Sequence, residues 1–445
     1  MNERPKFMLR LMSAALIAAM LASCGGTAAS SSKAASSKSG SAASSSAAAS
    51  DGSASGGESS AASSRAELSP ELAAIAHYQD PKQTAKGNYK KYGHYGNTPT
   101  DYCVLNGERD AWTWPYARDS IWNTPIGSDA EYSPAGFTKS AMYMIDDEYL
   151  FTTDSSDPVL EIYNTGMGNR WPADYKQSLK KSAYTTYWPK GVTIASTEKG
   201  NTCSAILQPD GRSLIQLQPT CREYLNADHV NGWDRGAATD IYGDGRLGTH
   251  WGSGLSTLGG SIRLGELTSD EPIRHALKFD IYAAWWVYYS KDLPGYKWPA
   301  DRADGYANKE GHALKYAGKN PLIVQGSLFA LDPSLTAESL GLKTEVGKKL
   351  FFALQNYGCY LVDDSACDAY NLCAEIGVDA EVKNKYGFSL NGRADSLFSS
   401  LDIRYYNDLM ALMTNLSVVT NNSEKSVGGG GTPRQPLAPD LKSVK

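Results

Sequence analysis

The chain has 445 residues, and its 43 lysines and arginines stand against 48 aspartates and glutamates, which gives a formal net charge of −5. This mildly acidic balance, without a basic block, argues against nucleic acid as a partner. The 27 tyrosines and 10 tryptophans outnumber the 9 phenylalanines. Such rings combine an apolar face with a polar edge, which suits stacking on sugar rings as well as an ordinary β-rich core.

Residues 1–23 predict a cleaved signal peptide. Arg4, Lys6 and Arg10 precede an apolar run that is shorter than the roughly 20 residues of a membrane-spanning helix. The tetrapeptide Leu21-Ala22-Ser23-Cys24 resembles the lipobox of bacterial lipoproteins. The resemblance implies cleavage before Cys24, lipidation of its thiol and a lipid-anchored, extracytoplasmic location at the cell membrane, with no other membrane contact. An ordinary secretory signal that contains a cysteine is the alternative.

The rest of the chain divides into three segments. Residues 24–65 form a Ser/Ala/Gly tract that cannot bury a core and predicts a flexible tether with a reach of roughly 35 Å. Residues 66–425 are expected to form one large domain. Residues 426–445 are expected to form a disordered tail.

Strand patterns dominate the domain after a short predicted helix at 70–78. Residues 204–218 predict a hairpin, 272–289 a long strand with period-two alternation, and 322–331 and 358–364 further strands. Helical patterns come late, at 344–358 and within 393–419. The expected fold is therefore mainly β: a single β-sandwich or jelly-roll-like domain with a few peripheral helices, mostly near the C-terminus.

Six cysteines follow Cys24, and outside the cytoplasm they could form three disulfides. The pairs Cys367–Cys373 and Cys203–Cys221 are expected from their proximity in sequence, and free structural thiols are the alternative. No CxxC pair or Cys/His spacing indicates zinc. The Asp-Gly turns at Asp240 and Asp244 offer oxygen ligands for calcium, but they do not fit the EF-hand pattern, so no cofactor is expected.

The stretch "GTHWGSGLSTLGGSIRLGEL" (248–267) contains six glycines. It lacks the lysine of a phosphate-binding P-loop, the third glycine of a dinucleotide fingerprint and the G-x-S-x-G of a nucleophile elbow. What remains is a glycine-rich loop that enters a strand, either as a structural turn or as part of a ligand cleft.

Four blocks of the chain share a further resemblance: "GSGLSTLGGSIRLGEL", "IRHALKFDIY", "GYKWPADRADGYA" and "ALQNYGCYLVDD". They resemble a family of secreted bacterial β-rich proteins associated with carbohydrate-rich surroundings, over roughly residues 110–420. Trp251 stands where the first block of that family often has glycine. The resemblance implies an exported β-rich architecture and assigns no catalytic residue.

The expected activity is therefore cleavage of a polysaccharide, with a lyase favoured over a hydrolase. A lyase needs a base, a cation that neutralises a uronate carboxylate, and an acid. The candidates for catalysis are His250, His275, Arg246 and Arg263. The residues expected to contact the glycan are Trp112, Trp114, Trp122, Trp251, Trp298, Asp301, Arg302, Asp304 and Tyr306.

Two alternatives remain open. A hydrolase would use two carboxylates, drawn from Asp240, Asp244, Glu266, Asp301 and Asp304. A cell-surface lipoprotein could also bind glycan through the same aromatic loops without cleaving it, which would require only exposed rings.

Overall fold

The computed structural model describes residues 109–164, 180–196, 198, 200–393 and 401–442. The predicted signal peptide, Cys24, the tether and the helix at 70–78 lie outside these ranges. The described chain is a mainly β single domain with a few short helices, as predicted from the sequence. None of the described helices is long and apolar enough to cross a membrane.

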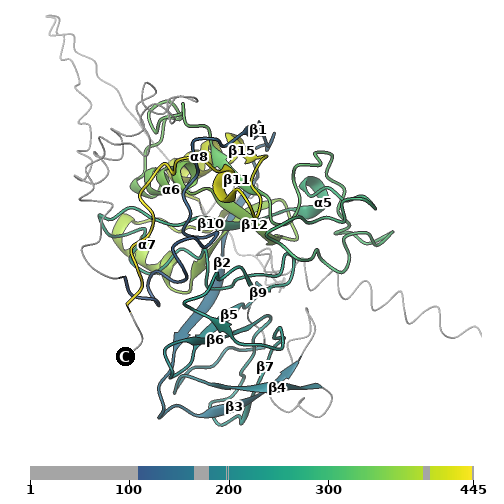
Figure 1. Cartoon of the computed structure of the whole chain (residues 1–445), viewed down its shortest axis with the longest axis vertical. Coiled ribbons are helices and arrows are strands. Elements are labelled where there is room, and N and C mark those ends of the chain that lie inside the picture. The colour runs from purple at the N-terminus through teal and green to yellow at the C-terminus, as the bar shows by residue number, and fades with distance from the viewer. Residues whose placement is uncertain (1–108, 165–179, 197, 199, 394–400, 443–445) are drawn as a thin grey trace, which may run out of the picture.

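One large mixed sheet forms the body of the molecule (Figure 1). Across it, the strands are β1 (Tyr132–Pro134), β15 (Leu416–Val419), β11 (Leu328–Leu331), β12 (Cys359–Asp364), β10 (Leu277–Ile281), β13 (Ala369–Glu375), β2 (Met142–Thr152), β5 (Ser204–Leu207), β6 (Ser213–Leu217) and β8 (Thr239–Asp240). The short strand β14 (Gly392–Arg393) also pairs with β2. The pairs β10–β12, β13–β2 and β2–β5 are parallel, so long connections join the central strands.

A second sheet of three strands lies at one end of the molecule (Figure 1). Its order is β4 (Lys180–Tyr187), β3 (Val159–Asn164) and β7 (His229–Asn231). Apolar side chains of this sheet, such as Ile162 and Val230, share a core cluster with Ile206 of β5 and Leu217 of β6. The two sheets therefore enclose a sandwich-type core at this end.

Three helices cover one face of the large sheet. They are α6 (Glu345–Asn356), α7 (Val378–Tyr386) and α8 (Ile403–Thr414). Their apolar residues form one core cluster with Leu277, Phe279 and Ile281 of β10 and with Leu361 of β12. This face is apolar because alternate residues of the central strands point toward the helices. The opposite face receives the remaining residues of those strands.

Local sequence signals account for several of these elements. The hairpin β5–β6 forms as predicted, and Asp210 Oδ1 accepts a 2.7 Å hydrogen bond from the Ser213 amide in its turn. Helix α6 also forms where predicted; Thr344 caps its N-terminus by accepting from the Gly347 amide at 2.9 Å. Gly358 adopts φ 78° directly before β12.

The strand predicted at 272–289 is shorter than expected. Strand β10 covers only Leu277–Ile281, and the chain then makes a single helical turn, α5 (Ala283–Trp286). The alternating pattern is thus confirmed for five residues. The sequence does not predict this helical turn, because period-two and helical patterns cannot be told apart over so few residues.

The cysteine pairing expected from sequence proximity is wrong. Cys203 is a free thiol beside His250, and Cys373 is a free thiol on β13. Cys367 is disulfide-bonded, but not to Cys373. Cys203 lies directly before β5 and Cys373 lies on β13, and both are buried as free thiols.

The segment after residue 426 also differs from the expectation of a disordered tail. Residues 427–429 form a short 3₁₀ turn, η3 (Val427–Gly429), and Leu441 bridges to Arg109 at the other end of the described chain. Arg434 is fully buried, and its guanidinium donates to Asn356 Oδ1 at 3.2 Å and to Gln355 Oε1 at 3.1 Å. Residues 426–442 therefore belong to the domain.

Candidate functional site

The face of the large sheet opposite the helices carries buried charge at its centre. Strand register sets Asp280 beside Asp363 on one side and Asn371 on the other, and sets Cys373 beside Asp146. Side chains at paired positions point to the same face. We call six buried residues of this region the charged cluster: Asp146, Glu148, His250, Lys278, Asp280 and Asp363.

Glu148 is the most highly connected member of the charged cluster. Its Oε1 atom lies 2.7 Å from His250 Nε2 and 2.7 Å from Lys278 Nζ, and Ser261 donates a short hydrogen bond to Oε2. Burial alone would raise the pKa of Glu148, but the Lys278 ammonium and His250 outweigh it and lower this pKa. Glu148 is therefore an ionised carboxylate in the interior.

His250 is held from both sides. Burial and Lys278 disfavour its charged form, but hydrogen bonding to Asp363 and Glu148 outweighs them and raises the pKa of His250. The ring has no exposed surface. A base that acts on an external substrate must reach the substrate's proton, so His250 is not placed for the role predicted from sequence.

Two other carboxyls of the charged cluster, those of Asp146 and Asp280, have raised pKa values. Burial raises the pKa of Asp146 to about 6, and burial followed by the nearby Asp146 charge raises the pKa of Asp280 well above its ordinary value. Asn201 Nδ2 donates to Asp146 at 3.0 Å and to Asp363 at 3.3 Å. Four carboxylates thus share this region with one lysine and one histidine.

The glycine-rich stretch 248–267 is the cover of the charged cluster. Lys278 donates to the Ser256 carbonyl at 3.0 Å and to the Thr257 carbonyl within it. A Cβ atom at Gly252 would lie 2.4 Å from Asp363 Oδ1, and one at Gly254 would lie 2.0 Å from Asp301 Oδ1. These glycines allow the backbone to approach the carboxylates closely.

A group of carboxylates and aromatic rings lies at the edge of this cover. Asp301 accepts from Arg235 and Arg302, and these arginines overcome the effect of burial and lower the pKa of Asp301. The Asp301 amide also donates to the Ser253 carbonyl at 2.9 Å. Arg302 lies 4.4 Å from the ring centroid of Trp251.

The pKa values of Asp364 and Asp304 are raised, whereas that of Asp301 is lowered. Burial raises the pKa of Asp364 to about 6 and raises the pKa of Asp304 well above its ordinary value; the charges of Asp363 and Asp364 add to the shift of Asp304. Tyr306 donates to Asp364 Oδ2 at 3.0 Å, and Tyr316 donates to Asp304 Oδ2 at 2.6 Å. These carboxyls are suited to carry protons near neutral pH.

Two indole rings adjoin this region. The ring centroids of Trp233 and Trp251 lie 4.4 Å apart, and Trp233 is 41% exposed. Trp251 is buried, and its Nε1 donates to the Gln218 carbonyl at 2.8 Å. The pair therefore presents a supported aromatic surface to solvent. We call Trp233, Trp251, Asp301, Arg302, Asp304, Tyr306 and Asp364 the acidic rim.

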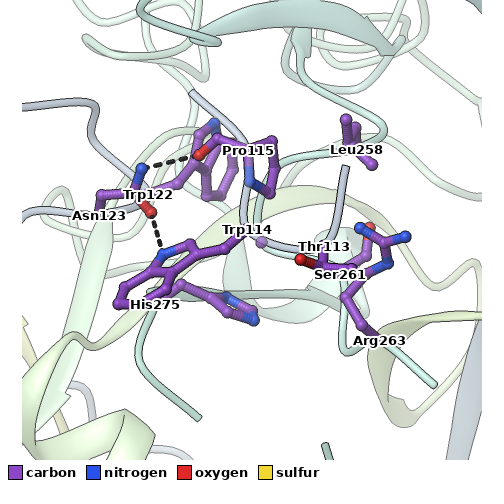
Figure 2. Close-up of a pocket in the computed structure, with 10 residues that line it drawn as sticks. Thr113, Trp114, Pro115, Trp122, Asn123, Leu258, Ser261, Arg263 and His275 are labelled. Carbon is purple, nitrogen blue, oxygen red and sulfur yellow. Dashed lines mark hydrogen bonds between the residues drawn. The ribbon is translucent and has the colours of Figure 1, made fainter. Parts of the chain in front are cut away.

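His275 and Arg263, also predicted to be catalytic, lie in a different place, a small pocket lined in part by Trp114 and Trp122 (Figure 2). The pocket has room for about one water molecule. His275 Nε2 lies 3.1 Å from both carboxylate oxygens of Glu266. Burial opposes the imidazolium, but Glu266 outweighs it and raises the pKa of His275. This is the arrangement of an internal ion pair.

The other residues of this pocket region are also engaged. Arg263 Nε donates to Glu375 at 2.8 Å, and its guanidinium lies 4.9 Å from the ring centroid of Trp112. Trp114 Nε1 donates to Asn123 at 2.8 Å (Figure 2). Trp122 is 1% exposed, and Gly259 and Gly260 accommodate its ring. Trp122 is therefore a core residue rather than a contact for a ligand.

The structure places the remaining predicted residues in supporting positions. Arg246 donates to the Pro299 carbonyl at 2.8 Å, and half-buried Trp298 packs against the core. Asp240 is ion-paired to Arg212 at 2.6 Å, and Asp244 accepts from the Arg246 amide at 3.1 Å. The two aspartates thus serve a salt bridge and a turn.

Sequence reasoning missed more than half of the site. The residues that it did not select are Asp146, Glu148, Cys203, Trp233, Arg235, Lys278, Asp280, Asp363 and Asp364. The signal for some of them is present, because "MYMIDDEYLFT" places three acids inside an otherwise apolar strand. Asp146 and Glu148 are buried in this central strand, whereas Asp147 is exposed.

No protein-family model, no curated protein and no solved structure matches this chain.

Proposed function

We propose that this protein is a lipid-anchored, extracytoplasmic enzyme that cleaves polysaccharide by hydrolysis at the acidic rim. The N-terminal pattern that ends at Cys24 supports the location. The tyrosine- and tryptophan-rich composition supports a glycan as the partner.

One observation carries the reaction type. Two carboxyls of the acidic rim have pKa values shifted in opposite directions: that of Asp301 is lowered and that of Asp364 is raised to about 6. Glycoside hydrolysis needs one carboxylic acid that donates a proton and one carboxylate that acts as base or nucleophile. Asp364 is our candidate for the acid, and Asp301 is our candidate for the carboxylate.

The lyase alternative has less support. It needs an imidazole or a similar base within hydrogen-bond reach of a uronate. His250 has no exposed surface, and His275 is bound to Glu266 beside a pocket with room for about one water molecule.

The exposed indole supports the mode of binding. A sugar ring stacked on Trp233 would be held by a surface that Trp251 supports from behind at a centroid distance of 4.4 Å. Arg302, over Trp251, offers hydrogen-bond donors to hydroxyl or carboxylate groups of the glycan.

The test uses the full chain with a panel of neutral and uronate-containing polysaccharides. We expect new reducing ends without the absorbance of unsaturated uronate. Asp364→Asn should lower kcat by about 10²–10⁴-fold, and Trp233→Ala should mainly raise KM. The matched controls are Asp292→Asn and Tyr224→Ala, which change exposed residues elsewhere.

Other outcomes would reject the proposal. Unsaturated uronate would identify a lyase. Retarded migration in a glycan gel that Trp233→Ala abolishes, without new reducing ends, would identify a binding lipoprotein. Absence of all three signals would refute the carbohydrate assignment altogether.

A further inference from the structure

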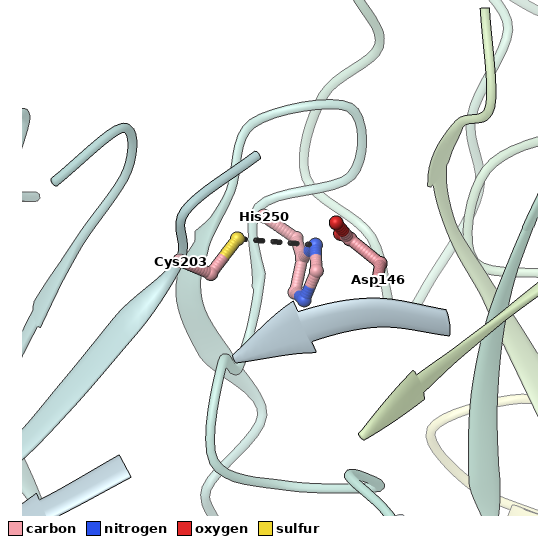
Figure 3. Close-up of side chains that lie close together, drawn as sticks. All are labelled: Asp146, Cys203 and His250. Atoms are coloured by element: carbon pink, nitrogen blue, oxygen red, sulfur yellow. Dashed lines mark hydrogen bonds between the residues drawn. The ribbon is translucent and has the colours of Figure 1, made fainter. Parts of the chain in front are cut away.

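Three potential metal ligands converge inside the charged cluster. The ligand atoms of Asp146, Cys203 and His250 all lie within 4.8 Å of one another, and all three residues are buried (Figure 3). Cys203 Sγ lies 3.9 Å from His250 Nδ1. They come from β2, the residue before β5, and the end of β9 (Leu247–His250), so the fold brings them together from distant parts of the chain.

A further carboxylate lies beside this set. Asp363 Oδ2 lies 3.6 Å from His250 Nδ1, and Asn201 bridges the carboxylates of Asp363 and Asp146. Donor atoms about 2.0–2.3 Å from a tetrahedral zinc ion are about 3.3–3.6 Å from one another. The 3.9 Å between Cys203 Sγ and His250 Nδ1 is close to this spacing.

The outer nitrogen of His250 has the partner that a metal-bound histidine requires. Its Nε2 atom lies 2.7 Å from Glu148, which Lys278 holds in turn. A carboxylate on the far nitrogen orients the ring and leaves Nδ1 directed at the ion.

Two other groupings of His, Cys and acidic ligands share members with this one. One uses Glu148, whose oxygens already accept from Lys278 and Ser261. The other contains Asp280 and Cys373 but no imidazole. The set around His250 Nδ1 is thus the one that combines an imidazole with a carboxylate to which Lys278 does not bond.

An independent observation points to a missing cation. The side-chain oxygen of Asn371 is buried and has no hydrogen-bond partner within the described ranges. Register places Asn371 beside Asp280, on the face that carries the charged cluster. A buried acceptor without a partner calls for a water molecule or an ion nearby.

We propose that Asp146, Cys203 and His250 bind one divalent transition-metal ion of the zinc class. All three ligands are buried, so the ion would have a structural rather than a catalytic role. The inference does not rest on the proposed glycan hydrolysis, because the site needs no substrate.

The test is cobalt substitution in the full chain. After removal of metal with a chelator, we expect titration with Co²⁺ to bind about one ion per chain, with visible absorption of tetrahedral Co²⁺ and a thiolate-to-cobalt charge-transfer band. Zn²⁺ should displace the cobalt and abolish both signals. Cys203→Ser should lose the charge-transfer band, and His250→Gln should lose tight binding.

Cys359→Ser is the matched control, because Cys359 is a buried free thiol on the apolar face of the sheet. It should leave the spectrum unchanged. If a variant fails to fold, the wild-type chain still tests the proposed metal site, because saturating Zn²⁺ should raise its melting temperature. Absence of stoichiometric Co²⁺ and Zn²⁺ binding, or a charge-transfer band that persists in Cys203→Ser, would overturn the proposal, whatever the result with polysaccharides.

Discussion

His250 Nε2 lies 2.7 Å from Glu148 Oε1, and neither side chain has any exposed surface. The contact joins β9, at the start of the glycine-rich stretch, to the central strand β2. It therefore attaches the cover of the charged cluster to the sheet. Its strength depends on the Lys278 ammonium, which bonds to the same carboxylate oxygen at 2.7 Å.

Removal of the Glu148 charge should destabilise the fold strongly. Glu148→Gln keeps the shape but leaves Lys278 without its counter-charge, and loss of one partner of a buried ion pair costs about 3–5 kcal/mol. Urea unfolding measures this change. The control Glu310→Gln removes the surface pair of Glu310 and Lys315, which should cost about 0–1 kcal/mol. Equal effects of the two substitutions would contradict the buried network.

The close approach of the glycine-rich stretch to Asp363 predicts that alanine at position 252 destabilises the fold more than alanine at position 305. In Gly252→Ala the new Cβ would lie 2.4 Å from Asp363 Oδ1 and 2.9 Å from Asp363 Cα. Such overpacking should reduce the free energy of unfolding by about 1–3 kcal/mol. Gly305→Ala meets nothing within 4 Å and should change it by about 0.5 kcal/mol or less. A neutral Gly252→Ala would mean that the cover is not seated on Asp363.

The ion pair of His275 and Glu266 should make stability depend on pH. Because the pKa of folded His275 is raised above 6.5, its protonation stabilises the fold below about pH 6.5, and this contribution is lost as the pH rises through the raised value. The lowered pKa of Glu266 adds stability above about pH 4.5, which is lost as the pH falls through the lowered value. The pair thus contributes most between these limits.

We therefore expect His275→Gln to destabilise the protein more at about pH 5.5 than at about pH 9. Thermal or urea unfolding at both pH values measures the difference. In a Glu266→Gln background the same substitution should lose most of this pH dependence. If the difference in unfolding free energy between the wild-type protein and His275→Gln grew toward alkaline pH, this mechanism would be wrong.

The buried arginine of the C-terminal segment gives the fourth prediction. Arg434→Ala leaves the side-chain oxygens of Asn356 and Gln355 without this donor and opens a cavity. The loss should be about 2–4 kcal/mol. Arg404→Ala removes a 60% exposed arginine from its pair with Asp402 and should cost about 0–1 kcal/mol. Indifference to Arg434→Ala would restore the expectation of a disordered tail.

Local patterns predict much of the fold. The hairpin β5–β6, helix α6 and strand β12 form where periodicity and turn residues place them, because their signals lie within a few residues. The C-terminal segment was missed because its glycines and prolines are typical of a linker. Its order comes from contacts with α6 that no local pattern encodes.

The charged cluster shows where sequence reasoning ends. The alternation in β10 correctly separates Lys278 from Leu277 and Phe279, but a polar face in a strand is usually assigned to solvent. Here the stretch 248–267 covers it, and Glu148 of strand β2 pairs with Lys278. Only one indole of the pair was predicted from the sequence. Trp251 belongs to the glycine-rich stretch, whereas Trp233 stands out only because its ring centroid lies 4.4 Å from that of Trp251.

The order of strands in the large sheet has a consequence for the folding of the newly synthesised chain. Met142 at the start of β2 lies opposite Ala369 at the start of β13, so the middle of the sheet joins two segments far apart in the chain. Closing such a long loop is slow, and it cannot begin before the second segment is available. A chain that emerges from its N-terminal end must therefore wait for β13 with its acidic strand β2 unpaired on that side. The centre of the sheet can therefore form only after most of the chain has been synthesised.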